Sequence, residues 1–214
     1  YNYSKTNDDQ TLNGNSAPNP RSATNRWSVN SMSFENSNYM NTNKLELYAL
    51  ELKSNFNDKL SNQLIATYTR ANDPKRSSNS SPFPFIDIWE GGFNYISAGY
   101  ELFSWNNDVQ NNTFTFNNNL TYNTGKHSIT AGLSYEQIYV KNYFIRYGTS
   151  YYRYNSLADF FNNATPSSFA ITFPVEGRSP FVELDFGQAS LYAQDEIKFN
   201  DKFKLTLGLR ADRS

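Results

Sequence analysis

Apolar and polar residues alternate with a period of two on both sides of three short polar turns. The turns read Phe56-Asn57-Asp58-Lys59, Tyr122-Asn123-Thr124-Gly125-Lys126 and Phe199-Asn200-Asp201-Lys202. Each one has an aromatic residue, then Asn, then a short polar stretch that ends in Lys. Asn, Asp and Gly tolerate the positive φ angles of tight hairpin turns. The pattern therefore predicts three antiparallel hairpins, which pair 44–56 with 60–70, 111–122 with 127–141, and 188–199 with 203–212.

The alternation separates each hairpin into an apolar and a polar face. The residues expected on the apolar face are Phe114, Phe116, Leu120, Ile129, Leu133, Leu205, Leu207 and Leu209. Those expected on the polar face are Thr113, Thr115, Thr130, Ser134, Thr206 and Arg210. Asp195 interrupts the apolar face of its strand, and the alternation offers no account of it.

Long segments without a clear period separate the hairpins, at residues 71–110 and 142–187, and residues 1–43 look similar. We expect one strand at Trp27 to Phe34 and a short helix at Leu157 to Asn162 within these segments. Short turns at one end and long loops at the other are typical of outer-membrane barrels. In a compact soluble domain, loops of this length would be unusual.

Two interpretations compete for the aromatic-rich alternation. One is a soluble β-sandwich with one buried face, and the other is a barrel wall with lipid outside and water inside. Aromatic residues beside all three turns favour the wall, because an interfacial girdle requires rings at one depth in every hairpin. The predicted fold is therefore all-β: about six or seven antiparallel strands of a transmembrane outer-membrane β-barrel with long extracellular loops.

Composition removes several classes of function. Lys plus Arg number 19 and Asp plus Glu 20, so the net charge of -1 argues against nucleic-acid binding. Cys is absent and His127 is the only histidine, which removes thiol chemistry and most metal sites. His127, at a hairpin start, is expected at the membrane interface without ligand partners. The sequence has no nucleophile–base pair, no phosphate-binding glycine loop and no metal-ligand spacing, and Asp195 and Glu196 point to opposite faces of a strand. We therefore expect no catalysis, no metal and no cofactor.

The long loops carry the best binding candidates. Aromatic residues gather in the segments 83–105 and 146–161, where rings and polar edges would suit sugar rings or peptide side chains. We expect ligand contact at Trp89, Tyr95, Trp105, Tyr151 and Arg153. The alternative is that these side chains pack the loops against each other.

The C-terminal hairpin resembles a known family. Residues 186–196 read FGQASLYAQDE and residues 205–212 read LTLGLRAD, which is similar to consecutive barrel strands of TonB-dependent outer-membrane receptors. The Asn- and Tyr-rich loops are similar to the Bacteroidota branch, with its Oar-like and SusC-like receptors. The resemblance implies a barrel of about 22 strands closed by a plug domain, in the outer membrane of a Gram-negative bacterium. It also implies uptake powered by a TonB–ExbB–ExbD complex.

No plug domain is recognisable within 1–214, so the chain is expected to be part of one receptor barrel. Its partners would be outer-membrane lipid, the remaining barrel and plug, the TonB complex and a surface lipoprotein. An eight-stranded barrel that uses residues 1–43 for two more strands is the alternative. In function, an energised receptor for a glycan, peptide or siderophore competes with a non-transporting adhesin or structural barrel, and with a soluble carbohydrate-binding sandwich.

Overall fold

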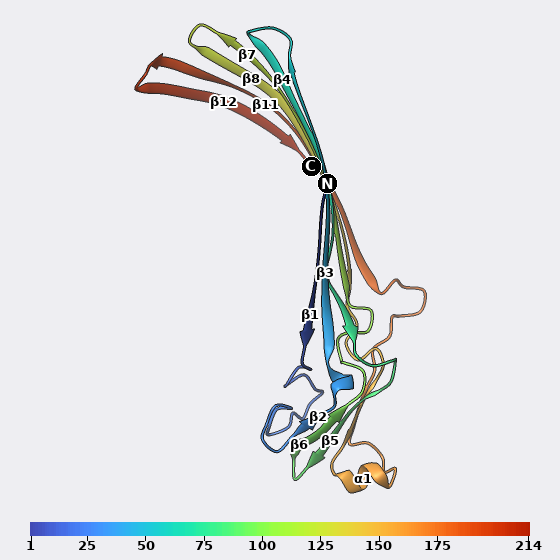
Figure 1. Ribbon diagram of the computed structural model, residues 1–214. Helices are drawn as coiled ribbons and strands as arrows, with labels where there is room; N and C mark the ends of the chain where they lie inside the picture. The colour runs from blue at the N-terminus through green and yellow to red at the C-terminus, as the bar shows by residue number, and fades with distance from the viewer.

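The computed structural model describes all residues, 1–214, as one long curved sheet with a smaller lobe at one end (Figure 1). The large sheet has seven strands, and every neighbouring pair is antiparallel. Their order is β1 (Asn2–Gln10), β3 (Tyr39–Asn55), β4 (Leu60–Ser78), β7 (Asp108–Thr124), β8 (His127–Tyr143), β11 (Phe181–Asn200) and β12 (Phe203–Arg213). The three predicted hairpins are confirmed, as β3–β4, β7–β8 and β11–β12.

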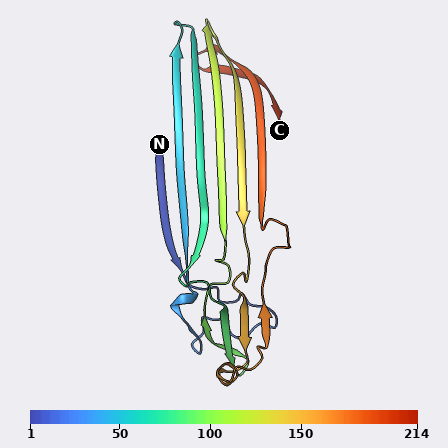
Figure 2. The ribbon, with the colours of Figure 1, turned by 90° about the vertical axis from the view of Figure 1, so that its right-hand side faces the viewer.

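All three tight turns lie at the same end of the sheet, as Figure 2 shows. Asn57 closes the first turn, because its Oδ1 accepts hydrogen bonds from the amides of Lys59 and Leu60, both at 2.9 Å. Asn200 closes the third in the same way, by accepting from the amide of Lys202 at 2.9 Å. Gly125 supplies the positive φ of 58° in the second. The repeated Asn therefore acts through its side chain as well as its backbone.

The lobe contains a second, five-stranded sheet built from the segments that were predicted to be irregular. Its order is β10 (Ser168–Ala170), β9 (Tyr151–Tyr154), β5 (Phe85–Glu90), β6 (Phe93–Ala98) and β2 (Met32–Ser33). A 3-10 helix, η1 (Glu35–Ser37), and α1 (Leu157–Phe161) complete it. The predicted helix is confirmed, and the Ser156 side chain caps it by accepting from the amide of Asp159 at 3.0 Å. Both helices, η1 and α1, are too short to span a bilayer.

Residues 1–43 correct two predictions. The strand expected at Trp27 to Phe34 is wrong except for the two residues of β2, which pair with β6. A strand that was not predicted, β1, instead pairs along its whole length with β3. Its sequence is almost entirely polar, so it has no hydrophobic period, and backbone pairing with β3 is what makes it a strand. Residues 1–43 thus add one long strand to the sheet and not two, which contradicts the eight-stranded alternative.

The strands extend beyond their predicted ends on the side away from the turns. The prediction ended the first hairpin at residue 70 and began the third at 188, whereas β4 continues to Ser78 and β11 begins at Phe181. The large sheet is a single layer with free edges at β1 and β12. No second sheet covers either of its faces, so the soluble sandwich is not what this chain forms.

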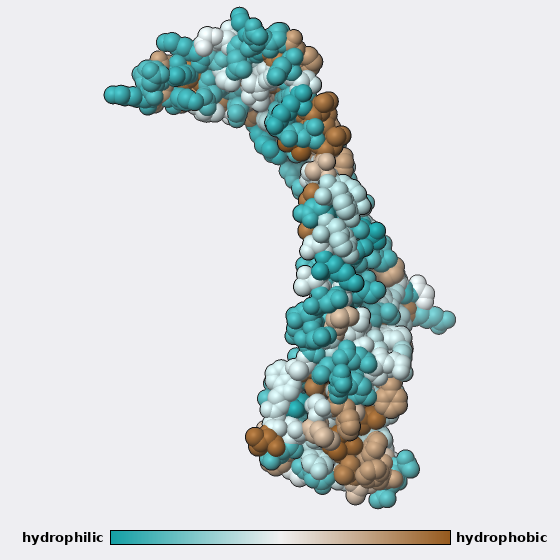
Figure 3. Space-filling view, viewed as in Figure 1, coloured by the Kyte–Doolittle hydropathy of each residue, from teal (hydrophilic) through white to brown (hydrophobic).

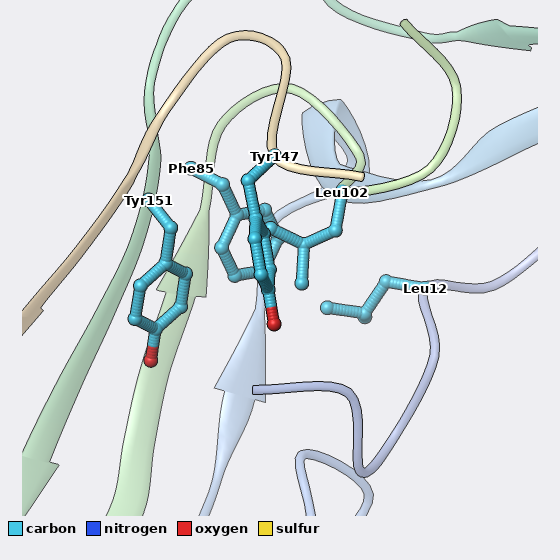
Figure 4. Close-up of a cluster of buried hydrophobic side chains, with 5 residues drawn as sticks. All are labelled: Leu12, Phe85, Leu102, Tyr147 and Tyr151. Carbon is cyan, nitrogen blue, oxygen red and sulfur yellow. The ribbon is translucent and has the colours of Figure 1, made fainter. Parts of the chain in front are cut away.

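The buried core of the molecule lies in the lobe. Leu12, Phe85, Leu102, Tyr147 and Tyr151 form its hydrophobic cluster (Figure 4). The rings of Phe85 and Tyr151 stack with centroids 6.2 Å apart, and Phe85 and Tyr151 are both 0% exposed. The large sheet contributes only Ser190 to the buried residues, so the two parts are stabilised in different ways.

Candidate functional site

One face of the large sheet, here the outer face, carries the predicted apolar residues. Tyr122 pairs with Ile129, Leu133 pairs with Leu191, and Asp195 pairs with Leu207, so alternate residues of four neighbouring strands share this side. Leu209 is 85% exposed and Leu191 66%, although both are leucines in regular strands. Figure 3 shows apolar side chains along the convex side of the curved sheet. An apolar face that no protein atoms cover is typical of a surface that contacts lipid.

Aromatic rings mark two levels on this outer face. Beside the turns lie Phe56, Tyr122, Phe199 and Phe203, with the last two rings 5.4 Å apart. A second level contains Tyr48, Tyr68, Phe114 and Tyr135, with ring centroids 6.5 Å apart for the first two and 6.4 Å for the last two.

The separation of the two levels fits a bilayer. Roughly 27 Å of strand separates Tyr122 from Phe114, and a strand tilt of about 40° reduces this to about 20 Å of depth. That is close to the apolar band of about 25 Å between the aromatic girdles of outer-membrane barrels. The first level was predicted from the turns. The second was missed, because Tyr48 and Tyr68 adjoin no turn motif.

The structure accounts for Asp195. The Asp195 carboxylate lies on the outer face near the turn end, where its Oδ2 is 2.6 Å from Nδ1 of His127. His127 pairs with Ile197 on the same face, two residues beyond Asp195 on β11. The interface position expected for His127 agrees with this placement, and the ion pair with Asp195 was not predicted from the sequence. A carboxylate on an apolar face is costly unless it is paired, and His127 supplies the pair.

The opposite, inner face is polar and hydrogen-bonded across the strands. Thr67 and Thr115 hydroxyls lie 2.6 Å apart, and the hydroxyl of Tyr192 donates to the side chain of Asn119. Arg210 donates to Ser190 Oγ at 2.7 Å, and a similar network continues to Asp212. In a barrel this face lines the interior, so the chain contributes a hydrophilic lumen wall.

The apolar face changes side toward the lobe end of the sheet. On β11 the alternation places Val182, Leu184 and Phe186 on the inner face, and Glu183 and Asp185 on the outer face. The pairing of β8 with β11 continues without a register shift, so the sequence pattern reverses while the backbone does not. The same reversal occurs on β3, where Leu45 and Leu47 are inner and Glu46 is outer. The apolar outer band therefore ends just above the second aromatic level.

A buried ionic network holds the lobe together. Asp87 on β5 is 0% exposed and accepts from Nε of Arg26 at 2.9 Å, from Ser97 Oγ at 2.5 Å and from the Tyr151 hydroxyl at 2.8 Å. A second contact from the Arg26 guanidinium makes the ion pair bidentate. Burial alone would lower the pKa of Arg26, but the Asp87 carboxylate raises it overall. Burial, reinforced by Asp87, raises the pKa of the Tyr151 hydroxyl, so that group acts as a donor.

Two arginines fix the segment that follows β1 to the lobe. Arg26 donates to the carbonyls of Asn13 and Ser16 at 2.8 and 3.0 Å. Arg153 donates to the carbonyls of Pro20 and Pro18 at 2.6 and 2.7 Å. Carbonyls of an irregular, partly buried segment need donors, and the fork geometry of guanidinium supplies two at a time.

The five residues predicted to contact ligand fall into two groups. Trp89 is 8% exposed, and the Arg153 guanidinium lies 4.1 Å from its ring centroid and donates to Tyr151 through Nε. Trp89, Tyr151 and Arg153 thus form part of the lobe interior, which is the packing alternative. Tyr95 is accessible and lines a cavity of about 550 Å³ with Met32 and other residues of the β2–β6 side. The ligand role of all five stays a prediction.

Trp105 lines a different cavity, here called the junction pocket, where the large sheet meets the lobe. The cavity has a volume of about 520 Å³, and its lining includes Lys75, Arg76, Trp105, Asp108, Lys141 and Phe181. Lys141 and Phe181 continue the outer-face alternation of β8 and β11, and Lys75 pairs with Asp108 between β4 and β7. Lys75 and Arg76 were missed because they lie in segment 71–110, which was predicted to be irregular, and Lys141 because it is the last residue of a predicted hairpin strand.

Glu101 is buried next to this pocket. It is 2% exposed, and it accepts from the hydroxyl of Ser104 at 2.6 Å and from the amide of Phe103 at 2.9 Å. Burial raises the pKa of the Glu101 carboxyl, although these two hydrogen bonds and the nearby Arg76 and Arg26 act in the opposite direction.

Comparison with known proteins identifies the class that this geometry defines. The family model described as "Outer membrane beta barrel domain" matches residues 1–213. The chain therefore belongs to the outer membrane β-barrel domain family, and its place is the outer membrane of a Gram-negative bacterium. No curated protein matches the chain, and no solved structure matches it. With the family known, the outer face is the lipid face, the turns are periplasmic and the lobe is extracellular.

Proposed function

We propose that the chain is part of the barrel of a TonB-dependent receptor that takes up a large nutrient, such as a glycan, a peptide or a siderophore. The observation that carries this proposal is the polar inner face, where hydrogen bonds such as Thr67–Thr115 and Arg210–Ser190 run from strand to strand. A water-filled or plugged interior requires such a wall. The resemblance of residues 186–212 to TonB-dependent receptors supports the same class.

The free edges of the large sheet support a barrel larger than this chain. The backbone N–H and C=O groups on the outer edges of β1 and β12 have no partner strand, and the hydrocarbon of a bilayer cannot form hydrogen bonds with them. Further strands would satisfy these groups, and barrels of about 22 strands hold a plug in the lumen. In this proposal, residues 1–214 belong to one receptor barrel domain, and the remaining strands and the plug are its partners.

The apolar patch on the inner face fits the same arrangement. Val182 is 73% exposed and Leu184 57% on the lumen side of β11, above the lipid band. An apolar patch on a water-facing wall favours coverage by another part of the protein. A plug or the loops of the remaining barrel would cover it, and a surface lipoprotein over the lobe is a further partner in this proposal. The chain binds and admits solute and carries out no catalysis.

Uptake by the source bacterium tests the proposal. Fluorescent glycan, peptide and ferric siderophore probes are supplied to the parent strain, to a strain lacking the receptor, and to the parent treated with a protonophore. We expect uptake of one of the three probes to be abolished both in the deletion strain and in the de-energised parent. The full-length gene should restore that uptake in the deletion strain. Unchanged uptake of all three probes would overturn the proposal. A loss of surface attachment alone would favour a non-transporting adhesin or structural barrel.

A further inference from the structure

The junction pocket opens on the lipid side of the barrel wall. On β7, Asp108 and Gln110 share the face of Phe114, because the pairing of β7 with β8 runs without a register shift. On β8, Lys141 and Tyr143 share the face of Tyr135 for the same reason. The pocket is therefore outside the lumen, and a solute in transit would not meet it.

Its height places the pocket just above the hydrocarbon boundary. Roughly 13 Å of strand separates Phe114, in the second aromatic level, from Gln110 at the base of the pocket. At a strand tilt of about 40° this is about 10 Å above the girdle. The headgroups of the outer leaflet occupy this height. In a Gram-negative outer membrane, those headgroups are the phosphorylated sugars of lipopolysaccharide.

The lining has the chemistry that such a headgroup requires. Three cations, Lys75, Arg76 and Lys141, line the cavity with only one carboxylate, Asp108. One oxygen of that carboxylate, Oδ1, already accepts a hydrogen bond from the side chain of Asn72 at 3.2 Å. A surplus of cations in a partly enclosed cavity attracts phosphate.

Aromatic rings supply the surface for sugar rings. Tyr100 and Trp105 meet edge to face with centroids 5.9 Å apart, and Tyr143 lies 6.1 Å from Phe181. All four rings line the cavity. The Lys141 ammonium lies 3.5 Å from the ring centroid of Phe181 and 3.3 Å from the Glu183 carboxylate, which hold it at the pocket. Rings with polar edges stack on the apolar faces of sugars while the cations bind phosphate.

We infer that the junction pocket binds the phosphorylated saccharide headgroup of outer-leaflet lipopolysaccharide. The lipid chains would lie below it, against the apolar outer face between the two aromatic levels. Binding would also tie the lobe to the membrane surface, because the pocket is formed jointly by strand ends and by the lobe segment 100–107. This inference depends on membership of the outer-membrane family and is independent of the proposed transport.

Affinity for a defined lipopolysaccharide tests the inference. The full-length receptor, purified in detergent, is titrated with rough-type lipopolysaccharide that carries only lipid A and inner-core sugars. We expect Lys75→Gln combined with Lys141→Gln to weaken binding by about tenfold or more. The matched control replaces two lysines of the periplasmic turns, Lys126→Gln with Lys202→Gln, and should bind as the parent does. Heat-modifiability on gels checks that every variant assembles its barrel.

Two further probes identify the source of the phosphate. Dephosphorylated lipopolysaccharide should bind the parent about as weakly as the intact lipid binds the double variant. The inner-core saccharide phosphate freed from its lipid should bind more weakly than the anchored form. Equal affinity of parent and double variant for the intact lipid would overturn the inference. So would equal affinity of the parent for the free and the anchored saccharide, because the pocket would then be a site for a soluble ligand.

Discussion

The barrel wall and the extracellular lobe place their apolar side chains in opposite environments. In the wall, no protein atoms cover most of the surface of Leu209 and Leu191, because these side chains face lipid. In the lobe, Phe85 and Tyr151 are fully buried, and the charges of Arg26 and Asp87 are buried with them. The stability of the wall depends on the surrounding lipid and on pairing between neighbouring strands, whereas the lobe is stabilised by a buried core of its own. Substitutions that damage one part should therefore spare the other.

The largest effect is expected from Asp87→Ala in the lobe. Removing the carboxylate leaves the buried guanidinium of Arg26 without a counter-charge and the hydroxyls of Ser97 and Tyr151 without an acceptor. Breaking a buried ion pair costs about 3–5 kcal/mol. Hydrogen–deuterium exchange of the full-length receptor should show faster exchange throughout the lobe, while barrel assembly on gels is unchanged.

A control with an exposed carboxylate sharpens this test. Asp58 lies in the first turn, at the other end of the molecule, and Asp58→Ala should leave exchange in the lobe as in the parent. If Asp87→Ala disrupts barrel assembly as strongly as it loosens the lobe, the two parts are not independent.

The next effect concerns the wall and compares neighbouring residues on its two faces. Leu133 lies on the outer face and Ser134 on the inner face of β8. An arginine on the lipid face near the midplane costs about 2–4 kcal/mol. Leu133→Arg should therefore reduce assembly in lipid vesicles and lower the urea midpoint much more than Ser134→Arg does. Equal effects of the two substitutions would contradict the assignment of the faces.

A smaller effect is expected at the His127–Asp195 pair of the outer face. His127→Leu leaves the Asp195 carboxylate without its partner at 2.6 Å, at a cost of about 1–3 kcal/mol. Replacing both residues by leucine should recover most of that loss, because an apolar pair suits a lipid face better than a single carboxylate. The test is to measure the free energy of unfolding in lipid vesicles for the parent, for His127→Leu and for the double leucine variant. A double variant as unstable as His127→Leu would show that the cost comes from lost packing.

The smallest effect concerns pH and the lobe alone. Burial holds the pKa of Glu101 above its usual value of 4.5. The folded lobe therefore binds this proton more tightly than the unfolded chain does. The resulting stability is fully present below the usual pKa and is lost as the pH rises through the raised one. Thermal unfolding of the lobe, followed by near-ultraviolet circular dichroism, should occur at lower temperature as the pH increases over this range.

The variant Glu101→Gln isolates this dependence. The amide oxygen can still accept from Ser104 and from the amide of Phe103, and it carries no charge at any pH. The unfolding temperature of this variant should vary less with pH over the same range. A pH profile identical to that of the parent would assign the dependence to another group.

The wall could be predicted from the sequence because its structure is local and periodic. Alternation around the Asn turns was sufficient to predict three hairpins and to assign Leu133 and Ser134 to opposite faces. Successive side chains of a strand point to opposite faces regardless of its partner strands. Register could also be anticipated there, because the short turns determine which residues face each other. The expectation of an outer-membrane barrel came from this part of the chain, and the family match over residues 1–213 confirms it.

The lobe and the candidate sites were decided by the tertiary structure. In β5, Asp87 lies within an apolar run, and its role cannot be predicted from that run. The fold brings Arg26, 61 residues away, into an ion pair with it. Tyr151 and Arg153 look like exposed loop residues in the sequence, and only the parallel pairing of β9 with β5 buries them. The junction pocket likewise combines Lys75, Trp105 and Lys141 from three segments. Local patterns determine which face a strand residue occupies, whereas burial, ion pairing and cavities depend on contacts between distant segments, which no local pattern records.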